Sequence, residues 1–568
     1  MKSIRVPIPT RLLAPIFSAT LSALLLASCA IGERPETRAT EPVAVKVLAI
    51  NDFHGNLKPP LGGIRIKDPA DPSKTINVPA GGAEFLATAV AELRRKNPNH
   101  IFVAAGDLIG ASPLLSALFR DEPTIESLGL MGLEVTAVGN HEFDRGGAEL
   151  LRMQRGGCHP TEGCKGTQTF AGASFKYLAA STIDTRTGKP LLPAYHVKRF
   201  GGIPVAFIGL TLKDTPNIVV PSGVAGLTFR DEAQTVNELV PELKRQGIEA
   251  IVVLIHEGGL PTGDYNECPG ISGPIVDIVK KLDKAVDLVV SGHTHRAYNC
   301  RIDGRLVTSA DKFGTIVTEI DLVLDPKTGD VMSSQANNLI VRNDRYAKDP
   351  AQTQLIAIYE QLSAPLAQRL VGRLAAPLSR DEAPNGEIPI GQVVADAQLA
   401  ATRAAADGGA QIALMNPGGL RAALQPRADG SVRYEDLFAV QPFYNNLVTM
   451  TLTGAQLVQV LEQQWLNQPR PRILQVSRGF SYAWDAARPV GQRVLPGSLT
   501  LDGRVIGAAD RLRVTVNSFL AAGGDSFVAL KDGSERRTGA MDIDAFDAYI
   551  AANPTIPASA PARIRRMP

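Results

Sequence analysis

The sequence predicts an α/β protein with metal-type ligands gathered at one edge of its sheets. Between residues 43 and about 341, short apolar segments rich in Val, Ile or Ala alternate with longer amphipathic segments. Five apolar segments are each followed within three residues by His, Asp or Asn: residues 43–50, 100–105, 135–138, 250–255 and 286–290. Strands buried on both faces deliver the residues after them to a common edge of the sheet. We therefore expect the five loops to converge.

These loops contain most of the histidines in the chain. Their sequences are Asn51-Asp52-Phe53-His54-Gly55, Gly106-Asp107-Leu108, Gly139-Asn140-His141-Glu142-Phe143-Asp144, His256-Glu257-Gly258 and Gly292-His293-Thr294-His295. Five of the eight histidines lie in them, whereas chance placement would scatter histidines over the whole chain. Imidazole, carboxylate and amide groups bind divalent metal ions, so the pattern predicts a metal site.

The third loop carries a candidate catalytic pair. Asn140 offers an amide oxygen to a divalent ion, and His141 can donate a proton or a hydrogen bond to a developing oxyanion. Asp144 can hold the imidazole of His141 in the required tautomer. Two alternatives remain: Asp144 is a helix N-cap before Arg145-Gly146-Gly147, or the whole loop is a polar turn after an apolar strand.

Composition excludes few classes of function. A chain of 568 residues with 44% hydrophobic and 20% charged residues has room for two or three globular domains. Lys and Arg total 59 against 57 Asp and Glu, so no basic field favours a nucleic-acid polymer as a partner. No feature predicts a protein partner.

The N-terminal segment is expected to direct export. Lys2, Arg5 and Arg11 precede an apolar stretch at residues 12–26, and Leu26-Ala27-Ser28-Cys29 has the small-residue pattern of a cleavage site. This arrangement resembles a bacterial lipoprotein signal, which implies a signal peptide at residues 1–28 and a lipid anchor on Cys29. A plain signal peptide and an uncleaved anchor are the alternatives. Ala30 is not the Asp of an inner-membrane retention signal, so we expect an outer-membrane anchor facing the periplasm or the cell surface. Residues 29–42 would form the tether.

Four further cysteines are expected to form disulfides. An even number in an exported protein indicates two bonds, and three connectivities are possible. Proximity favours Cys158 with Cys164, which leaves Cys268 with Cys300. A zinc site built from these thiols is the alternative, although the spacing has no Cys-x-x-Cys pair.

The segments between the ligand loops continue the alternation. After a Pro- and Gly-rich excursion at residues 58–81, we expect helices at residues 82–96 and 113–130. A strand at residues 205–210 and a helix at residues 231–246 follow. This order predicts a doubly wound or sandwich-like domain with its helices outside.

The C-terminal part of the sequence has a different character. An amphipathic helix at residues 351–369 is expected to connect it to the first domain. The C-terminal part has no clusters of metal-binding residue types. Three of its segments stand out: Asn416-Pro417-Gly418-Gly419-Leu420-Arg421, Gln441-Pro442-Phe443-Tyr444-Asn445-Asn446 and Asn517-Ser518-Phe519-Leu520-Ala521-Ala522-Gly523-Gly524-Asp525. Phe443 could equally fill a core, and Asn416 and Gly523-Gly524 could merely shape turns.

Taken together and in this order, the motifs resemble those of calcineurin-like metallophosphoesterases, in particular the bacterial 5'-nucleotidase, UDP-sugar hydrolase and 2',3'-cyclic phosphodiesterase group. The resemblance covers nearly the whole mature chain. It implies a β-sandwich flanked by helices at residues 43–342, a linker helix at residues 343–372 and an α+β substrate-binding domain at residues 373–560.

The resemblance also implies roles for individual residues. One metal ion would be held by Asp52, His54 and His295, a second by Asn140, His256 and His293, and Asp107 would bridge both. His141 and Asp144 match the catalytic pair of the family. The implied nucleotide contacts are Phe443 and Phe519 on the two faces of the base, Asp525 at the ribose, and Asn416 and Arg421 at the base or phosphate end.

Two departures from the family pattern concern the metals and the phosphate. His295 stands where some members carry Gln, so an extra imidazole could shift the metal preference. The arginines that bind phosphate in the family, ahead of the segment matching Ile390-Gly391-Gln392, have no clear counterpart, and Arg380 is the candidate. Pro389 replaces an Asn found in many members.

The expected activity is hydrolysis of nucleotide phosphate esters. Two cations roughly 3.5–4 Å apart can activate a shared water and bind phosphoryl oxygens, and this ligand set suits Zn, Mn, Fe or Co. We expect removal of phosphate from 5'-nucleoside monophosphates, a step in nucleotide catabolism. The alternatives are 2',3'-cyclic-nucleotide phosphodiesterase and UDP-sugar hydrolase. More remote are a thiosulfate-ester hydrolase, a non-catalytic nucleotide-binding surface lipoprotein and a metal-storage lipoprotein.

Overall fold

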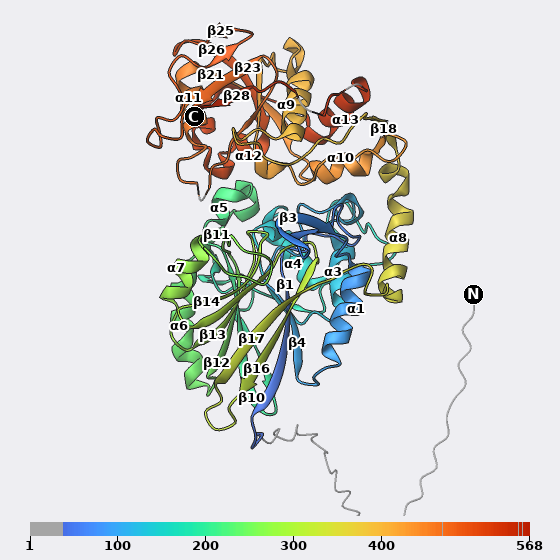
Figure 1. The fold of residues 1–568 in the computed structure, drawn as a ribbon, viewed down its shortest axis with the longest axis vertical. Helices are drawn as coiled ribbons and strands as arrows, with labels where there is room; N and C mark the ends of the chain where they lie inside the picture. The colour runs from blue at the N-terminus through green and yellow to red at the C-terminus, as the bar shows by residue number, and fades with distance from the viewer. Residues whose placement is uncertain (1–37, 469, 555, 559, 568) are drawn as a thin grey trace, which may run out of the picture. The chain divides into compact units, whose positions relative to one another are not determined.

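Two six-stranded sheets form the N-terminal part of the protein in the computed structural model, which describes residues 38–567 except Pro469, Thr555 and Ser559 (Figure 1). The first sheet has the order β17 (Val331–Ile340), β16 (Ile316–Leu324), β1 (Val43–Ile50), β4 (His100–Ala104), β5 (Val135–Ala137) and β6 (Lys176–Leu178). The second has the order β14 (Ala297–Ile302), β15 (Arg305–Ala310), β13 (Val286–Ser291), β12 (Ala250–His256), β10 (Ile203–Thr211) and β9 (Tyr195–Phe200).

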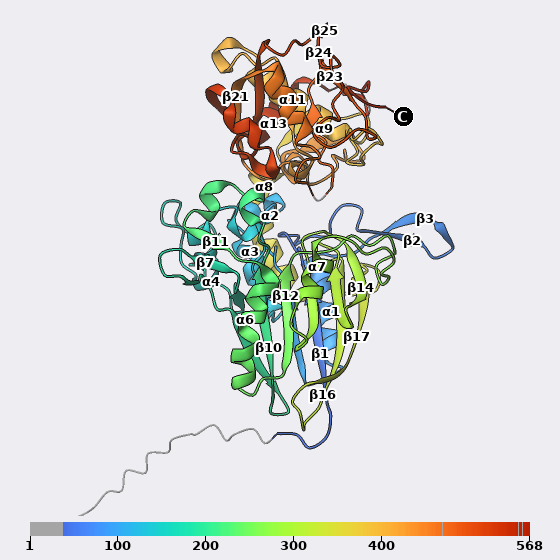
Figure 2. The same cartoon turned by 90° about the vertical axis from the view of Figure 1, so that its left-hand side faces the viewer.

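The two sheets pack face to face with helices outside (Figure 2). Their shared core includes Val47 and Val103 of the first sheet and Phe207 and Val252 of the second, all fully buried. The outer face of the first sheet is covered by α1 (Ala83–Arg94), and that of the second by α6 (Glu232–Arg245) and α7 (Pro274–Lys281). Of the two arrangements that the sequence left open, the structure therefore has the sandwich.

The predicted strands that precede the ligand loops are all present. In β10 and β12 every residue is buried, which explains their uninterrupted apolar sequences. The strands β1, β4 and β5 run parallel in the first sheet, and β12 and β13 run parallel in the second. Because parallel strands end at the same edge, the loops that follow them meet.

One predicted segment was wrong in detail, and another contains strands that the sequence did not indicate. Residues 113–130 do not form one helix but two, α2 (Leu114–Ala117) and α3 (Glu122–Leu130). The break lies at Arg120 and Asp121, whose φ angles of 56° and 66° are incompatible with a continuous right-handed helix. The excursion at residues 58–81 contains a hairpin of β2 (Ile64–Asp68) and β3 (Asp71–Val78).

The helix α8 (Pro350–Ala367) connects the sandwich to the C-terminal domain. That domain contains a five-stranded sheet in the order β22 (Gln475–Val476), β19 (Ile412–Met415), β26 (Arg511–Asn517), β21 (Asn446–Thr453) and β27 (Ser534–Met541). Residues of α9 (Pro389–Thr402) and α13 (Asp542–Ala552) contribute to one hydrophobic core, and α11 (Gly454–Glu462) contributes to another. Three of the four strand pairs in this sheet are antiparallel, which makes this an α+β domain.

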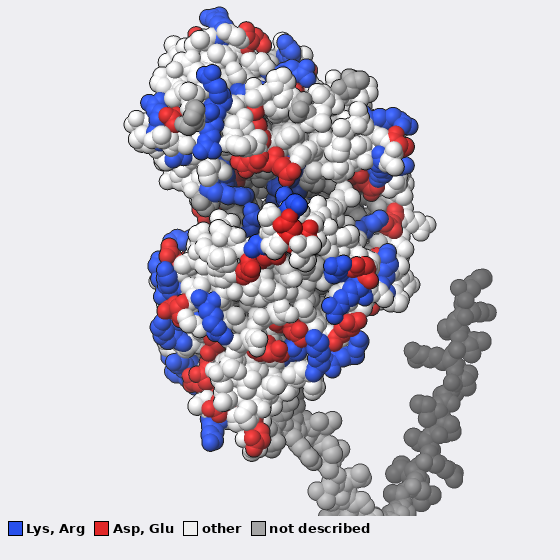
Figure 3. Space-filling model, viewed as in Figure 1, with Lys and Arg blue, Asp and Glu red and all other residues white. Residues whose placement is uncertain are grey.

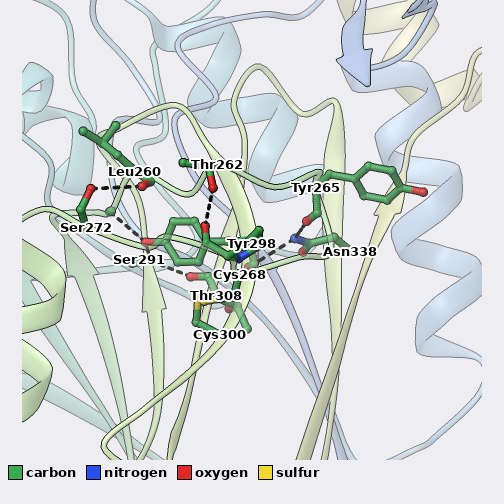
Figure 4. Close-up of a disulfide and its surroundings, with 12 residues drawn as sticks. Leu260, Thr262, Tyr265, Cys268, Ser272, Ser291, Tyr298, Cys300, Thr308 and Asn338 are labelled. Atoms are coloured by element: carbon green, nitrogen blue, oxygen red, sulfur yellow. Dashed lines mark hydrogen bonds between the residues drawn. A yellow bond between two sulfur atoms is a disulfide. The ribbon is translucent and has the colours of Figure 1, made fainter. Parts of the chain in front are cut away.

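Both disulfides join the cysteines that sequence proximity favours, Cys158 with Cys164 and Cys268 with Cys300. Figure 4 shows the second bond, which attaches the loop after β12 to β14. In the same region Tyr298 Oη accepts a hydrogen bond from Gly259 N (3.1 Å) and lies 2.7 Å from Ser291 Oγ. This polar network ties two ligand loops together.

The predicted signal peptide and Cys29 lie outside the described residues. Within the part of the chain that the structure describes, no helix combines the length and the apolar character needed to span a membrane.

Candidate metal centre

The structure brings the predicted ligands of the first metal together at the edge of the two sheets. The Nε2 atoms of His54 and His295 lie 3.1 Å apart, and Asp52 Oδ1 lies 3.2 Å from His295 Nε2. Asp52 and His54 are fully buried, so their side chains are shielded from solvent. The three residues form a group able to hold one ion.

A second group lies beside the first. Asp107 Oδ2 is 2.9 Å from His256 Nε2, and Asn140 Oδ1 is 3.1 Å from His293 Nδ1. The same Asp107 oxygen is 3.7 Å from His54 Nε2, a member of the first group. Asp107 thus stands within reach of both groups, as a bridging carboxylate must.

The backbone of these loops is strained. Among the seven predicted ligands, Asp52, His54, Asp107, His293 and His295 have φ between 46° and 68°. Each such conformation costs on the order of 1–3 kcal/mol for a residue with a Cβ atom. Strain of this kind persists only where the surrounding structure dictates it, and it is common at functional sites.

Glycine allows the loops to approach one another. A Cβ atom at Gly139 would collide with the carboxylate of Asp107, and one at Gly106 would collide with the ring of His256. The Gly-Asp and Gly-Asn pairs of the motifs therefore bring ligands closer than any larger residue would permit.

Hydrogen bonds to the backbone orient two imidazoles. His54 Nδ1 lies 2.8 Å from the carbonyl of Gly110, and His256 Nδ1 lies 2.7 Å from that of Ala105. A carbonyl only accepts, so each Nδ1 carries a proton, and Nε2 is the nitrogen whose lone pair a metal ion would take. In both residues Nε2 is the atom that faces the other ligands.

Burial and local charge set the protonation states. Burial lowers the pKa of His54 and of His295, and burial with the charge of His256 lowers the pKa of His293 to about 3. Burial opposes ionisation of Asp52 and Asp107, but neighbouring imidazoles lower the pKa of both carboxyls. Burial alone would lower the pKa of His256, yet Asp107 raises it to about 10. Neutral imidazoles and ionised carboxylates are the forms that bind metal ions.

The residues therefore fit two divalent cations. Asp52 Oδ1 and His256 Nε2 are buried and make no well-directed hydrogen bond among the residues that the structure describes. Buried polar atoms normally have partners, and two imidazole nitrogens 3.1 Å apart need either a shared proton or a cation. Mixed nitrogen and oxygen donors suit Zn, Mn, Fe or Co.

His141 and Asp144 lie next to the ligands. His141 Nδ1 is 2.7 Å from Asp144 Oδ2, and the backbone N–H of His141 donates to Asp107 Oδ1 (2.8 Å). The N-cap of the next helix, α4 (Gly147–Arg155), is Gly146, so Asp144 does not serve as that cap. Burial lowers the pKa of His141, but Asp144 and Asp107 outweigh it and raise the pKa overall. A cavity of about 70 Å³ adjoins the pair and is also lined by Phe443.

The predicted nucleotide-binding residues fall into two sets. In the first, Arg421 Nη2 lies 3.5 Å from His54 Nε2, and Phe443 stacks on His141 with ring centroids 5.9 Å apart. In the second, Asn416 Nδ2 donates to Asp525 Oδ2 (2.8 Å), and Phe519 packs over Gly524. The structure thus brings one set to the metal ligands and groups the other around Asp525.

Sequence reasoning missed three residues that support the site. Glu142 accepts hydrogen bonds from the backbone N–H groups of Leu108 (2.8 Å) and Gly139 (2.6 Å), which joins two ligand loops. Asn51 donates to Asp52 Oδ2 (2.7 Å), and Arg472 pairs with Asp525. Glu142 and Asn51 lie inside the quoted motifs, so their position was a usable signal, whereas no local pattern indicated Arg472.

Comparisons with known proteins show which family models and relatives the chain matches. The family models for calcineurin-like phosphoesterase and for the 5'-nucleotidase C-terminal domain match residues 45–297 and 369–532. The chain is 32% identical to the endonuclease YhcR of Bacillus subtilis over 520 residues, 91% of this chain but only 40% of that relative. It therefore spans less than half of the endonuclease.

Two further proteins match over most of their length. The cell wall protein Lmo0130 of Listeria monocytogenes is 32% identical over 575 residues, 94% of this chain and 71% of the relative. The crystal structure of the 5'-nucleotidase precursor from Thermus thermophilus is 26% identical, with a TM-score of 0.75, and the match covers 92% of this chain and 99% of that one. The chain belongs to the calcineurin-like phosphoesterases that carry a 5'-nucleotidase C-terminal domain.

Proposed function

We propose that the protein hydrolyses nucleotide phosphate esters and that its preferred substrates are 5'-nucleoside monophosphates. The observation that carries this proposal is the His141–Asp144 pair, 2.7 Å apart, beside two ligand groups that share Asp107. Family membership and the similarity to a 5'-nucleotidase precursor support the choice of substrate. The two bound cations would supply an activated water and Lewis-acid stabilisation of the phosphoryl group.

The residues of the chain have distinct tasks in this proposal. Asp144 occupies Nδ1 of His141, which leaves Nε2 free to donate to the leaving oxygen. Against the effect of burial, Asp144 and Asp107 raise the pKa of His141, which favours the protonated imidazole that donates. Arg421, beside His54, offers a planar cationic fork to the phosphoryl oxygens.

The nucleoside would be held by the C-terminal domain. Phe443 and Phe519 offer aromatic faces that stack on any base. Asp525 would accept hydrogen bonds from ribose hydroxyls, for which it must exchange part of its present bonding to Asn416 and Arg472. The site therefore selects nucleotides through stacking and ribose contacts, and the metal ligands act on the phosphate.

The test is hydrolysis by the mature domain loaded with Mn or Zn, followed as phosphate from AMP, as p-nitrophenol from bis-p-nitrophenyl phosphate, and as nucleotide products from UDP-glucose and 2',3'-cyclic AMP. AMP, UDP-glucose, 2',3'-cyclic AMP and bis-p-nitrophenyl phosphate are assayed in parallel. We expect AMP to be turned over fastest and His141→Ala to abolish most of this turnover. If the protein binds two metals per chain and turns over none of these substrates, the proposal is wrong.

A second candidate comes from a relative that is named an endonuclease and is 32% identical over 520 residues. A short single-stranded DNA and its RNA equivalent, each labelled at one end, belong in the same assay. Internal cleavage faster than AMP hydrolysis would move the assignment to nucleic-acid phosphodiesters, against our expectation of no polymeric partner.

We also propose that the protein is exported and anchored through a lipid on Cys29. The relative named a cell wall protein supports export. Metabolic labelling with a palmitate analogue, followed by membrane fractionation, tests the anchor with Cys29→Ser as the control. Equal labelling and equal membrane association of both forms would contradict it.

A further inference from the structure

Asp542 is a buried carboxylate that the proposed chemistry does not use. It begins α13 and is 1% exposed. Its Oδ1 accepts a hydrogen bond from the backbone N–H of Ile543 (2.8 Å), and its Oδ2 accepts one from Asn445 Nδ2 (3.3 Å). Its own backbone N–H donates to the carbonyl of Asn445 (2.8 Å). Asp542 thus holds Asn445 through both its side chain and its backbone.

Asn445 joins the two segments that carry the predicted base-stacking rings. Its Oδ1 accepts a hydrogen bond from Ser518 Oγ (3.2 Å), while its Nδ2 donates to Asp542. Phe443 lies two residues before Asn445. Phe519 directly follows Ser518. One amide side chain therefore ties the segment of Phe443 to that of Phe519, and Asp542 fixes the orientation of this amide.

The turn between Phe443 and Asn445 needs such support. Tyr444 has a φ of 54°, a left-handed conformation that a bulky side chain seldom adopts and that costs on the order of 1–3 kcal/mol. Its ring packs on that of Phe438 in α10 (Tyr434–Val440), with centroids 5.0 Å apart. A strained backbone persists only where its surroundings dictate it. The hydrogen bonds of Asn445 supply that constraint on one side of the turn.

The pairing of three strands brings the same segments together. β21 lies between β26 and β27 in the sheet of the C-terminal domain. Leu447 lies opposite Asn517 of β26, and Asn446 lies opposite Met541 of β27. Asn445 directly precedes β21, at the end of both ladders. Beyond this point side chains must hold the segments together.

A second set of hydrogen bonds reaches the predicted ribose contact. Asn517 Oδ1 accepts from the backbone N–H of Leu520 (2.8 Å) in α12 (Ser518–Ala521). Asn517 Nδ2 donates to Asn416 Oδ1 (2.9 Å), and Asn416 Nδ2 donates to Asp525 Oδ2 (2.8 Å). The segments of both rings and of Asp525 are therefore joined by hydrogen bonds into one frame.

Asp542 can act on a nucleotide only through the residues that it contacts. Figure 3 shows charged side chains exposed in the hollow in the middle of one face, whereas Asp542 is 1% exposed. A carboxylate in the first turn of a helix also interacts favourably with the helix dipole, which is the competing explanation for this residue. Asp544 lies in the same turn of α13 and is exposed, so it shares that interaction and provides a control.

We propose that Asp542 is a positioning residue that holds the rings of Phe443 and Phe519 in place to stack on one base. This inference rests on the proposed nucleotide hydrolysis and adds to it a residue outside the motifs that predicted the nucleotide contacts. Loss of the carboxylate frees the amide of Asn445 to rotate, so the strained turn relaxes and the two rings lose their alignment. The effect falls on binding of the base and not on the reaction at the phosphate.

The experiment measures kcat and KM for AMP and for ribose 5-phosphate in the wild type, Asp542→Ala, Asp542→Asn and Asp544→Asn. We expect KM for AMP to rise about tenfold in Asp542→Ala, because rings that must be ordered on binding cost affinity. The kcat for AMP and both constants for ribose 5-phosphate should keep their wild-type values. Asp542→Asn should show a smaller rise, since an amide offers one oxygen to the two donors. Asp544→Asn should match the wild type.

Binding of adenosine, measured by equilibrium dialysis, requires no turnover and separates this proposal from the proposed activity. Weaker binding in Asp542→Ala than in the wild type, without hydrolysis of any nucleotide, would support the positioning role and reject the hydrolase. Equal binding by the two forms, or no binding by either, would overturn the positioning role whether or not AMP is hydrolysed. An equal rise in KM for AMP and ribose 5-phosphate would overturn it as well, because the effect then reaches the phosphate.

The route through Asn445 is tested by a double variant. In the background of Asn445→Ala, the further change Asp542→Ala should leave the affinity for adenosine unchanged, since the amide that transmits the effect is gone. Additive losses would show that Asp542 acts by another route and would overturn the proposal. Circular dichroism and thermal melts establish that each variant is folded. If Asp542→Ala is not, Asp542→Asn takes its place in both comparisons.

Discussion

The Nδ1 atom of His141 lies 2.7 Å from Oδ2 of Asp144, three residues further along the chain. The imidazole is thereby held by a carboxylate on one side and left free on the other. The proposed catalytic pair is therefore distinct from the candidate metal ligands, because neither His141 nor Asp144 belongs to the two ligand groups.

Replacing His141 by Ala should therefore lower kcat by about 10²- to 10⁴-fold, the usual contribution of a general acid. Both metal ions should remain, since the ligands are intact. Asp144→Asn should have a smaller effect, because the imidazole is retained and only its orientation and charge support are weakened. Phosphate release and elemental analysis of the same samples measure the two properties. Loss of metal together with activity in His141→Ala would show that this residue is a ligand.

Replacing Glu142 by Gln should weaken the binding of metal ions by about 10- to 100-fold, as is typical when a residue that supports the ligands is changed. Glu142 joins the loops of Asp107 and Asn140 through backbone N–H donors, and an amide has only one oxygen to accept them. Titration of the metal-free protein with Zn or Mn gives the affinity. Unchanged affinity would mean that the loops keep their positions without this residue.

Removal of the metal ions with a chelator should lower the melting temperature as well as the activity. Ions that bind only the folded state stabilise it by about 2.7 kcal/mol at a concentration one hundred times the Kd. His256→Ala should abolish most of this stabilisation. His196→Ala, on strand β9 at the edge of the second sheet, is the matched control and should respond to metal like the wild type. Thermal melts of the wild type and of both variants, with and without added metal, measure this stabilisation.

Replacing Phe443 by Ala should reduce kcat/KM for AMP more than for ribose 5-phosphate. Stacking on a base contributes about 1–3 kcal/mol, and ribose 5-phosphate has no base to stack. In the structure Phe443 also stacks on His141, so a common loss on both substrates is the competing outcome. That outcome would assign Phe443 to positioning of His141.

Stability should fall as the pH rises through the range in which Asp287 ionises. Burial and the charge of Asp330 raise the pKa of Asp287 to about 8, although Ile251 N donates to its carboxylate. The pKa of this carboxyl is near 4 in the unfolded state and higher in the folded state. Its contribution to the free energy of unfolding is therefore fully present below about pH 4 and is lost between about pH 4 and pH 8. The Asp287→Asn variant cannot ionise at this position. Its free energy of unfolding should therefore increase relative to that of the wild type as the pH rises over that range.

Chemical denaturation at several pH values measures this difference, which we expect to be on the order of a few kcal/mol, since one pKa unit corresponds to about 1.4 kcal/mol. Asp277→Asn, an exposed position on α7, is the control for the loss of one negative charge. A difference that does not change with pH, or that changes equally in the control, would contradict the assignment.

Much of the catalytic domain could be predicted because its strands have no polar face. β12, for example, is buried throughout, so its apolar sequence and the following His256 stand out in the sequence. The convergence of the ligand loops follows from parallel pairing, which needs no knowledge of side-chain packing. The break between α2 and α3 could not be predicted, because left-handed conformations at Arg120 and Asp121 depend on tertiary contacts.

The role of Arg472 was beyond prediction for a related reason. This arginine pairs with Asp525, which lies far along the chain, and no local pattern marks it. The contact arises from the packing of loops, and arginines are common on every protein surface. By contrast, Arg421 was identified because it ends a motif shared with a known family.

Two ligands of one metal group, His54 and His295, are separated by 241 residues. An ion that joins them is a cross-link between the two sheets and closes a loop almost as long as the whole catalytic domain. Its affinity therefore depends on the folding of that entire domain, since no local segment presents all three ligands of the group. Capture of the metal is then a late event in maturation, and a chain that has not folded cannot compete for the ion.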